Sequence, residues 1–162
     1  MKVVFLFTFL VSVFVVTPKV SQIRADYSKS NGNREMIVKL HDALTSVERK
    51  DNKVLVAYKG AVLTAMAKYA KGKKEKKEFF KNGAELLEFA VTSQPNDIEI
   101  RTIRLSIQEN APKFLKYNKS IPEDKEFILK NYKKISSSAV REFVSSYVKQ
   151  SKGFSASEKE QL

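Results

Sequence analysis

The chain has 162 residues, of which 43% are hydrophobic, and it carries a formal net charge of +12. It contains no cysteine, which excludes a fold held together by disulfides and a lipid-anchored bacterial lipoprotein. A balance this basic favours acidic partners such as anionic lipid headgroups, acidic polysaccharide or nucleic acid, but charge alone does not choose among them.

The N-terminus has the pattern of an export signal. Lys2 is followed by an uncharged apolar run over residues 3–16, which Thr17 and Pro18 close. This run is typical of a secretory signal peptide and is shorter than the roughly 20 apolar residues of a bilayer-spanning helix. We expect residues 1–25 to be a signal peptide cleaved near residues 21–25, which makes the protein periplasmic or extracellular with no transmembrane segment after processing. The alternatives are a buried first helix and a short membrane anchor.

The remaining chain, residues 26–162, has the size of one ordinary domain and retains 27 basic and 18 acidic residues. Residues 26–34 are polar and contain glycine, which predicts a flexible leader. From residue 35 onward, apolar residues recur at helical spacing, and prolines, glycines and capping residues separate the segments. The expected helices span residues 35–49, 53–71, 79–93, 98–110, 121–135 and 139–150.

These segments predict an all-α fold of about six antiparallel helices in a helical domain over residues 35–152, followed by a frayed tail over residues 153–162. The lysine-rich segment 72–78 is expected to be a solvated connection. Residues 98–107 also partly satisfy a strand period, but a lone strand among helices would leave its backbone unpaired. We expect residues 79–110 to form a hairpin on which the other helices stack, through Leu86, Leu87, Ala90 and Ile103.

The central stretch resembles a degenerate tetratricopeptide-type helical repeat. Gly83 and Ala90 occupy its small-residue positions, Leu87 stands where a bulky aromatic is usual, and Pro95 follows five residues after Ala90. The resemblance covers residues 35–135 and implies stacked helix pairs whose first helices line a peptide-binding groove. On this chain the implied groove face comprises Glu99, Thr102, Ser106 and Glu109, with Arg101 and Arg104 beside it. The chain also resembles small exported helical proteins of Bacteroidota-like bacteria, which implies no mechanism.

Groups suited to catalysis are few. His41 is the single histidine, so a zinc site lacks a ligand set, and the glycines are too isolated for a phosphate-binding loop. Glu85 and Glu88 lie three residues apart on a predicted helix and could align two carboxylates, but a solvated face paired with nearby lysines is the much simpler explanation. We therefore expect no enzyme activity, no metal and no cofactor, with a hydrolase using Glu85 or Glu88 as a remote alternative.

The remaining candidate site is basic. Seven lysines gather before and within the third predicted helix, with Phe79 and Phe80 beside them: Lys68, Lys71, Lys73, Lys74, Lys76, Lys77 and Lys81. They could contact phosphate or anionic lipid, although a solvated loop next to two core phenylalanines is the simpler interpretation. The candidate binding residues are Lys73, Lys74, Lys76, Lys77, Arg101 and Arg104.

Two functions follow as expectations. The first is an exported, non-enzymatic helical-repeat module that binds a protein or peptide. The alternative is a peripheral binder of anionic lipid or polysaccharide that acts through the basic cluster. Nucleic acid is not an expected partner, because the later aromatics repeat at helical spacing and are explained by core packing.

Overall fold

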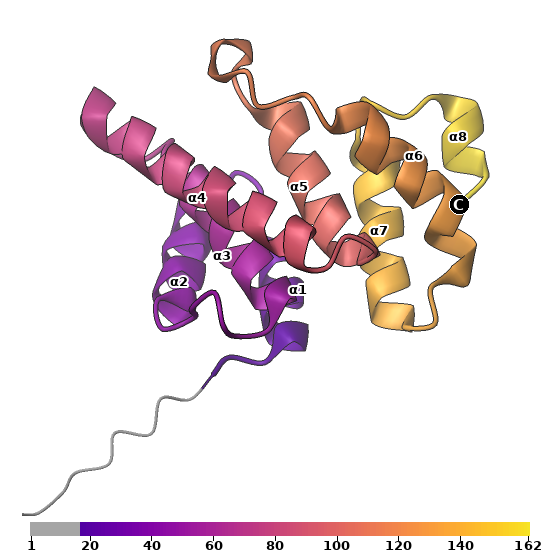
Figure 1. The fold of residues 1–162 in the computed structure, drawn as a ribbon, viewed down its shortest axis with the longest axis horizontal. Helices are drawn as coiled ribbons and strands as arrows, with labels where there is room; N and C mark the ends of the chain where they lie inside the picture. The colour runs from indigo at the N-terminus through magenta and orange to yellow at the C-terminus, as the bar shows by residue number, and fades with distance from the viewer. Residues whose placement is uncertain (1–16) are drawn as a thin grey trace, which may run out of the picture.

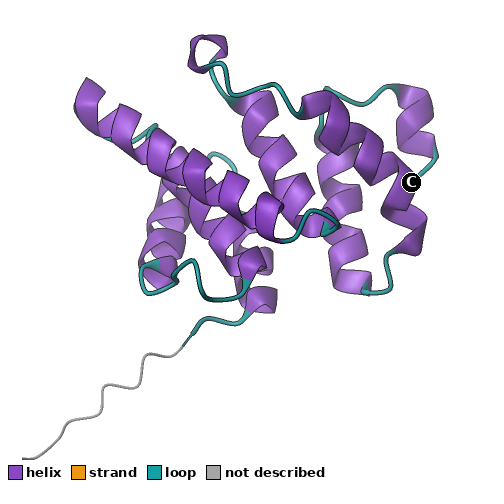
Figure 2. Ribbon diagram, viewed as in Figure 1, coloured by secondary structure: helices purple, strands orange, loops and turns teal. Residues whose placement is uncertain are grey.

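The computed structural model describes residues 17–162, which form an all-helical protein (Figures 1 and 2). The apolar run of the predicted signal peptide, residues 3–16, lies outside the described residues. Among residues 17–162 there is no strand, and no helix has the length and apolar content needed to cross a membrane. The helices are α1 (Val20–Ser28), α2 (Arg34–Leu44), α3 (Lys53–Met66), α4 (Lys73–Ser93), α5 (Ile98–Asn110), α6 (Ile121–Asn131), α7 (Ser138–Gln150) and α8 (Ala156–Glu160), with short 3-10 helices η1 (Lys113–Leu115) and η2 (Tyr132–Lys134).

Helices α2 to α7 correspond to the six helices that the sequence predicts, and local signals explain where they begin. The side chain of Asn52 accepts from the backbone amide of Val54 (2.9 Å), and that of Asp97 accepts from the amide of Ile100 (3.0 Å). Each cap satisfies an amide that the first helical turn leaves free. The ambiguous segment after Asp97 is helical, as predicted.

Helix α5 is the centre of the fold. In Figure 1 it lies between a group formed by α1 to α4 and a group formed by α6 to α8, and it packs on α3, α4, α6 and α7. Eight of its 13 residues are buried, including the charged residues Glu99, Arg101 and Arg104. The nearly continuous apolar sequence of α3 is also buried, with nine buried residues, which confirms its predicted central place.

The helix pair with the most extensive packing is α3 with α4, rather than the predicted pair of α4 with α5. A Cβ atom at Gly83 would lie 2.5 Å from the carbonyl oxygen of Gly60, so the two backbones touch where neither residue has a side chain. Leu87 and Ala90 continue this buried face of α4. The predicted hairpin over residues 79–110 is therefore one part of a larger unit in which α3 is the main partner of α4.

The N-terminal boundary differs from the prediction. Residues 26–34, expected to be a flexible leader, contribute the last turn of α1, a short turn and the first residue of α2. Helix α1 is held by the buried side chain of Ile23 and by Arg24, which donates to both carboxylate oxygens of Glu99 at 2.8 and 2.7 Å. The helical body thus begins at Val20, because α1 has an ion-pair partner 75 residues away that local sequence does not reveal.

Two further segments are more ordered than predicted. Residues 73–78, expected to be a connection, form the first turns of α4, although all of them are exposed. The expected frayed tail contains α8, which Ser155 and Glu158 start with reciprocal capping hydrogen bonds. Buried Phe154 and an ion pair of Glu158 with Lys125 (2.8 Å) fasten this tail to the body.

Candidate functional site: a groove beside helix α4

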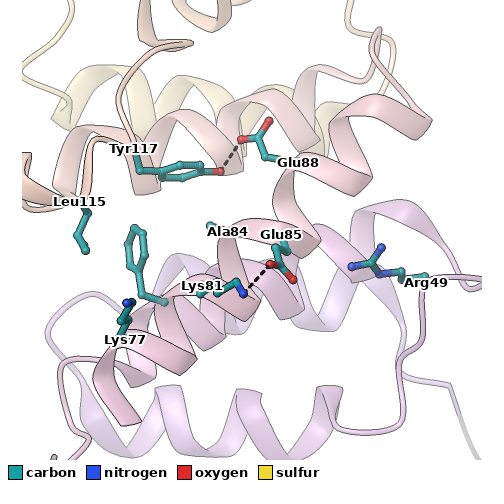
Figure 3. A pocket seen from close by; sticks show the side chains of 9 residues that line it. Arg49, Lys77, Lys81, Ala84, Glu85, Glu88, Leu115 and Tyr117 are labelled. Carbon is teal, nitrogen blue, oxygen red and sulfur yellow. Dashed lines mark hydrogen bonds and ion pairs between the residues drawn. The ribbon is translucent and has the colours of Figure 1, made fainter. Parts of the chain in front are cut away.

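A groove of about 540 Å³ runs along α4 (Figure 3). One wall is α4 itself, from Lys77 to Glu88, and the other is the connection between α5 and α6, through Leu115 and Tyr117. Arg49, from the loop between α2 and α3, lines the end near Glu85. Three segments that are distant in sequence therefore meet at this surface.

The floor of the groove is apolar and aromatic. Phe80, Ala84, Leu115 and Tyr117 are all partly buried. The rings of Phe80 and Tyr117 meet edge to face, with centroids 5.7 Å apart, a favourable arrangement for two aromatic side chains. An apolar side chain from a ligand would find a matching surface here.

The connection that forms the second wall has a defined shape. Pro112 precedes η1, and Lys116 then adopts left-handed backbone geometry, with φ of 52°. This turn separates Leu115 from Tyr117, and both reach the groove. Phe114, in η1, is 80% exposed and is the most exposed large hydrophobic residue of the described chain.

A buried ion-pair network supports the floor from below. The Tyr117 hydroxyl donates to Glu88 (2.7 Å), and Arg104 donates to the other oxygen of Glu88 (2.8 Å) and to both oxygens of Asp124 (2.7 Å each). Burial opposes ionisation of Arg104, but its hydrogen bonds to Asp124 and Glu88 outweigh that effect and raise its pKa. Burial, together with the Glu88 carboxylate, raises the pKa of Tyr117. The wall residues Tyr117 and Glu88 are therefore positioned by the core.

Arg101 and Arg104, predicted as binding residues at the rim, are instead buried parts of this network. Arg101 donates to Asp124 (2.8 Å), to Glu123 (2.7 Å) and to the carbonyl oxygen of Pro95 (2.6 Å). Asp124 is fully buried and has both guanidinium groups as partners. The two arginines are buried and neutralise the buried carboxylate of Asp124, so they do not face a ligand at the surface.

The peptide-binding face implied by the repeat resemblance is also inside the protein. Glu99 accepts from Arg24 and from the buried hydroxyl of Tyr58 (2.7 Å), and Thr102 is fully buried. Glu109 accepts from Tyr147 (2.5 Å), and Ser106 contacts Tyr27. Because side chains of α1, α3 and α7 contact this side of α5, the face implied for a peptide is occupied by the protein itself.

Only one of the four lysines predicted to bind a ligand lines the groove. Lys73, Lys74, Lys76 and Lys77 are all exposed on the first two turns of α4, but only Lys77 lines the groove. Lys73 and Lys81 lie four residues before and after Lys77, so they share its face of the helix. Lys76 lies on a neighbouring face.

Sequence reasoning missed Arg49, Leu115 and Tyr117. The signal for the last two was the pattern KFLKY after Pro112, where a short polar connection carries three large apolar or aromatic residues. No comparable signal marks Arg49, whose guanidinium lies 5.0 Å from the centre of the Phe89 ring.

The two carboxylates considered for catalysis have different partners. Glu85 lies 3.7 Å from Lys81, and one oxygen of Glu88 accepts from Tyr117 (Figure 3). The other oxygen of Glu88 accepts from Arg104. Residues 17–162 contain no cluster of three or more histidine, aspartate or glutamate side chains placed to hold a metal ion. What the groove offers chemically is an apolar floor with exposed cations at its edge.

Comparisons with protein-family models, with curated proteins and with solved structures found no match to this chain.

Proposed function

We propose that this protein is an exported, non-enzymatic helical module that binds a segment of a protein or peptide partner in the groove beside α4. The observation that carries the proposal is the combination of Arg49, Lys77 and Lys81 at the edge of an apolar floor. Ligand sites typically combine an apolar lining with a few polar groups that orient the ligand. A volume of about 540 Å³ admits a few side chains of a partner.

Two further features are part of the proposal. The apolar run over residues 3–16 supports export to the periplasm or the cell exterior. The close pair of α3 and α4, which meet at Gly60 and Gly83, supports kinship with a degenerate tetratricopeptide-type unit. In this proposal the ligand lies against the outer side of α4 and not on the face that such repeats commonly use.

The test is a selection from a displayed library of random short peptides on the purified protein. Enriched peptides are then compared on the variant Lys77→Glu/Lys81→Glu and on the matched control Lys130→Glu/Lys133→Glu, whose exposed lysines lie in and after α6. Both variants change the net charge equally. Peptides that bind the control but not the groove variant are the expected result, whereas a selection with no groove-dependent peptide contradicts the proposed function.

A second candidate function is peripheral binding to anionic lipid or polysaccharide. It is favoured by residues 71–78, which are all exposed and include five lysines against two glutamates, and by the exposed ring of Phe114. Exposed basic helices with nearby aromatics bind anionic membrane surfaces. Sedimentation with anionic vesicles that is weakened by salt and abolished by changing Lys73, Lys74, Lys76 and Lys77 to glutamate supports this candidate, and undiminished binding of that variant contradicts it.

A further inference from the structure

We infer that the segment bound in the groove is acidic and inserts one apolar anchor side chain between α4 and the α5–α6 connection. This inference rests on the proposed function and adds the chemistry of the partner. It is carried by the charges at the edge of the groove and by the hydrogen bonds that are already complete on its floor.

The charge at the edge of the groove is positive and largely unpaired. Neither Arg49 nor Lys77 has a carboxylate within ion-pair distance among residues 17–162. Lys81 has only the loose, exposed pair with Glu85 at 3.7 Å. The other acidic residue of the lining, Glu88, is balanced by the buried guanidinium of Arg104. A ligand therefore meets more free positive than negative charge.

The polar atoms of the floor already have partners. The Tyr117 hydroxyl is used by Glu88, and both oxygens of Glu88 are occupied. A polar ligand group placed on the floor would lose its water and gain no hydrogen bond from these groups, which costs free energy. An aliphatic or aromatic side chain against Phe80 and Leu115 loses no hydrogen bond, so it is the favoured anchor.

The basic edge continues beyond the groove. Lys73, Lys77 and Lys81 lie on successive turns of α4, and four residues of helix correspond to about 6 Å along the axis. A segment that carries several carboxylates along its length can pair with more than one of these lysines while its anchor stays in place. Such repeated pairing favours an acidic segment over a single small anion.

Other occupants fit these charges less well. A second copy of the chain carries the same net charge of +12, so its approach to this basic edge is opposed by electrostatic repulsion. The apolar N-terminal run, residues 3–16, has no carboxylate to offer the lysines. Charge complementarity therefore favours an acidic segment of another protein.

The experiment uses three short fluorescein-labelled peptides: an acidic peptide with one central leucine, the same peptide with lysine at every acidic position, and the acidic peptide with serine in place of leucine. Fluorescence anisotropy measures their affinity for the wild-type protein, for Lys77→Glu/Lys81→Glu, for Leu115→Asn and for the control Lys130→Glu/Lys133→Glu. Circular dichroism establishes that each variant is folded. Measurements at low and high salt separate the electrostatic part of the affinity.

We expect the acidic leucine peptide to bind most tightly and to lose about tenfold in affinity on Lys77→Glu/Lys81→Glu, since two exposed ion pairs are reversed. The control should lose far less, and replacing leucine by serine should abolish the sensitivity to Leu115→Asn. Equal losses of affinity on Lys77→Glu/Lys81→Glu and on Lys130→Glu/Lys133→Glu overturn the inference, because they indicate that the acidic peptide is attracted by the net charge of the whole protein and not by the groove. Groove-dependent binding of the lysine peptide, or of library peptides without acidic residues, overturns the inference but leaves the proposed function standing.

Discussion

The contact between Gly60 and Gly83 determines how closely α4 lies on α3, and a single methyl group at Gly83 tests it. In an exposed helix interior, replacing glycine by alanine stabilises a protein by about 1 kcal/mol. At Gly83 the new Cβ would lie 2.5 Å from the Gly60 carbonyl oxygen and 2.7 Å from both the backbone nitrogen and the methyl carbon of Thr64. Two of these three atoms belong to the backbone and cannot rotate away.

The expected size of the effect follows from these distances. Ordinary contact begins at 3.4 Å, so α4 must move from α3 by about 1 Å, which loosens the packing of Leu87 and Ala90. Overpacking of this kind costs about 1–3 kcal/mol, and more where the backbone must move. After the gain in helix propensity, we expect Gly83→Ala to lower the free energy of unfolding by about 2 kcal/mol, or the melting temperature by about 4–8 °C.

Urea unfolding followed by circular dichroism measures this change. Gly72→Ser is the matched control, because a Cβ at Gly72 meets nothing within 4 Å, and serine at this N-cap should change stability by less than about 0.5 kcal/mol. A Gly83→Ala protein as stable as the wild type, or more stable, would show that the two helices do not approach as described. The groove lies beside this contact, so the variant should also weaken peptide binding.

Three further predictions concern buried polar groups. Asp124→Asn should destabilise the protein by about 3–5 kcal/mol in urea unfolding, because it leaves Arg101 and Arg104 buried without their shared carboxylate. Glu123→Gln should cost less than about 1 kcal/mol, because the Glu123 side chain is 62% exposed. Similar effects of the two changes would show that Asp124 is not the centre of a buried ion-pair network. A protein lacking residues 1–25 should be less stable than one lacking residues 1–19 by about 3 kcal/mol or more, because the shorter protein loses the buried side chain of Ile23 and leaves Glu99 without Arg24. Equal stability of the two proteins would show that α1 is dispensable. Burial, and then the carboxylates of Glu99, Glu88 and Glu109, raise the pKa values of Tyr58, Tyr117 and Tyr147 above the ordinary value of 10.0. Their contribution to stability is therefore complete below pH 10 and is lost as the pH rises above it, by up to about 1.4 kcal/mol per pH unit for each tyrosine, because the unfolded state releases these protons first. Urea unfolding at several alkaline pH values checks this, with Tyr58→Phe expected to reduce the slope, and a free energy of unfolding that does not change above pH 10 would contradict it.

Much of the fold could be predicted because its signals are local. Asn52, Asp97 and Pro95 mark helix ends within a few residues of where they act, and the apolar spacing of α2 to α7 is visible in short windows. The candidate site was predictable only in part. Lys77 stood out within a run of lysines, but nothing local connected it to Arg49 or to Tyr117.

The largest errors concern charged residues of α5 and both ends of the helical body. Arg101 and Arg104 have the sequence appearance of a basic surface, but their carboxylate partner Asp124 lies 23 and 20 residues further along the chain. Arg24 and Glu99 are 75 residues apart, so the segment before residue 35 looked like a leader. An ionisable side chain gives no sign in sequence of whether its partner is water or a buried opposite charge.

The sequence by itself determined that the protein is all-helical, that it is strongly basic, and where six of its helices lie, because caps, prolines and periodicity act over a few residues. Only the tertiary structure decided that α5 is buried with its charges, that α1 and α8 belong to the body, and that the α5–α6 connection lies against α4 to form a groove. Those features depend on pairs of residues that are distant along the chain and meet only when the helices pack. The packing of Gly60 on Gly83 and of Arg104 between Asp124 and Glu88 selects that arrangement.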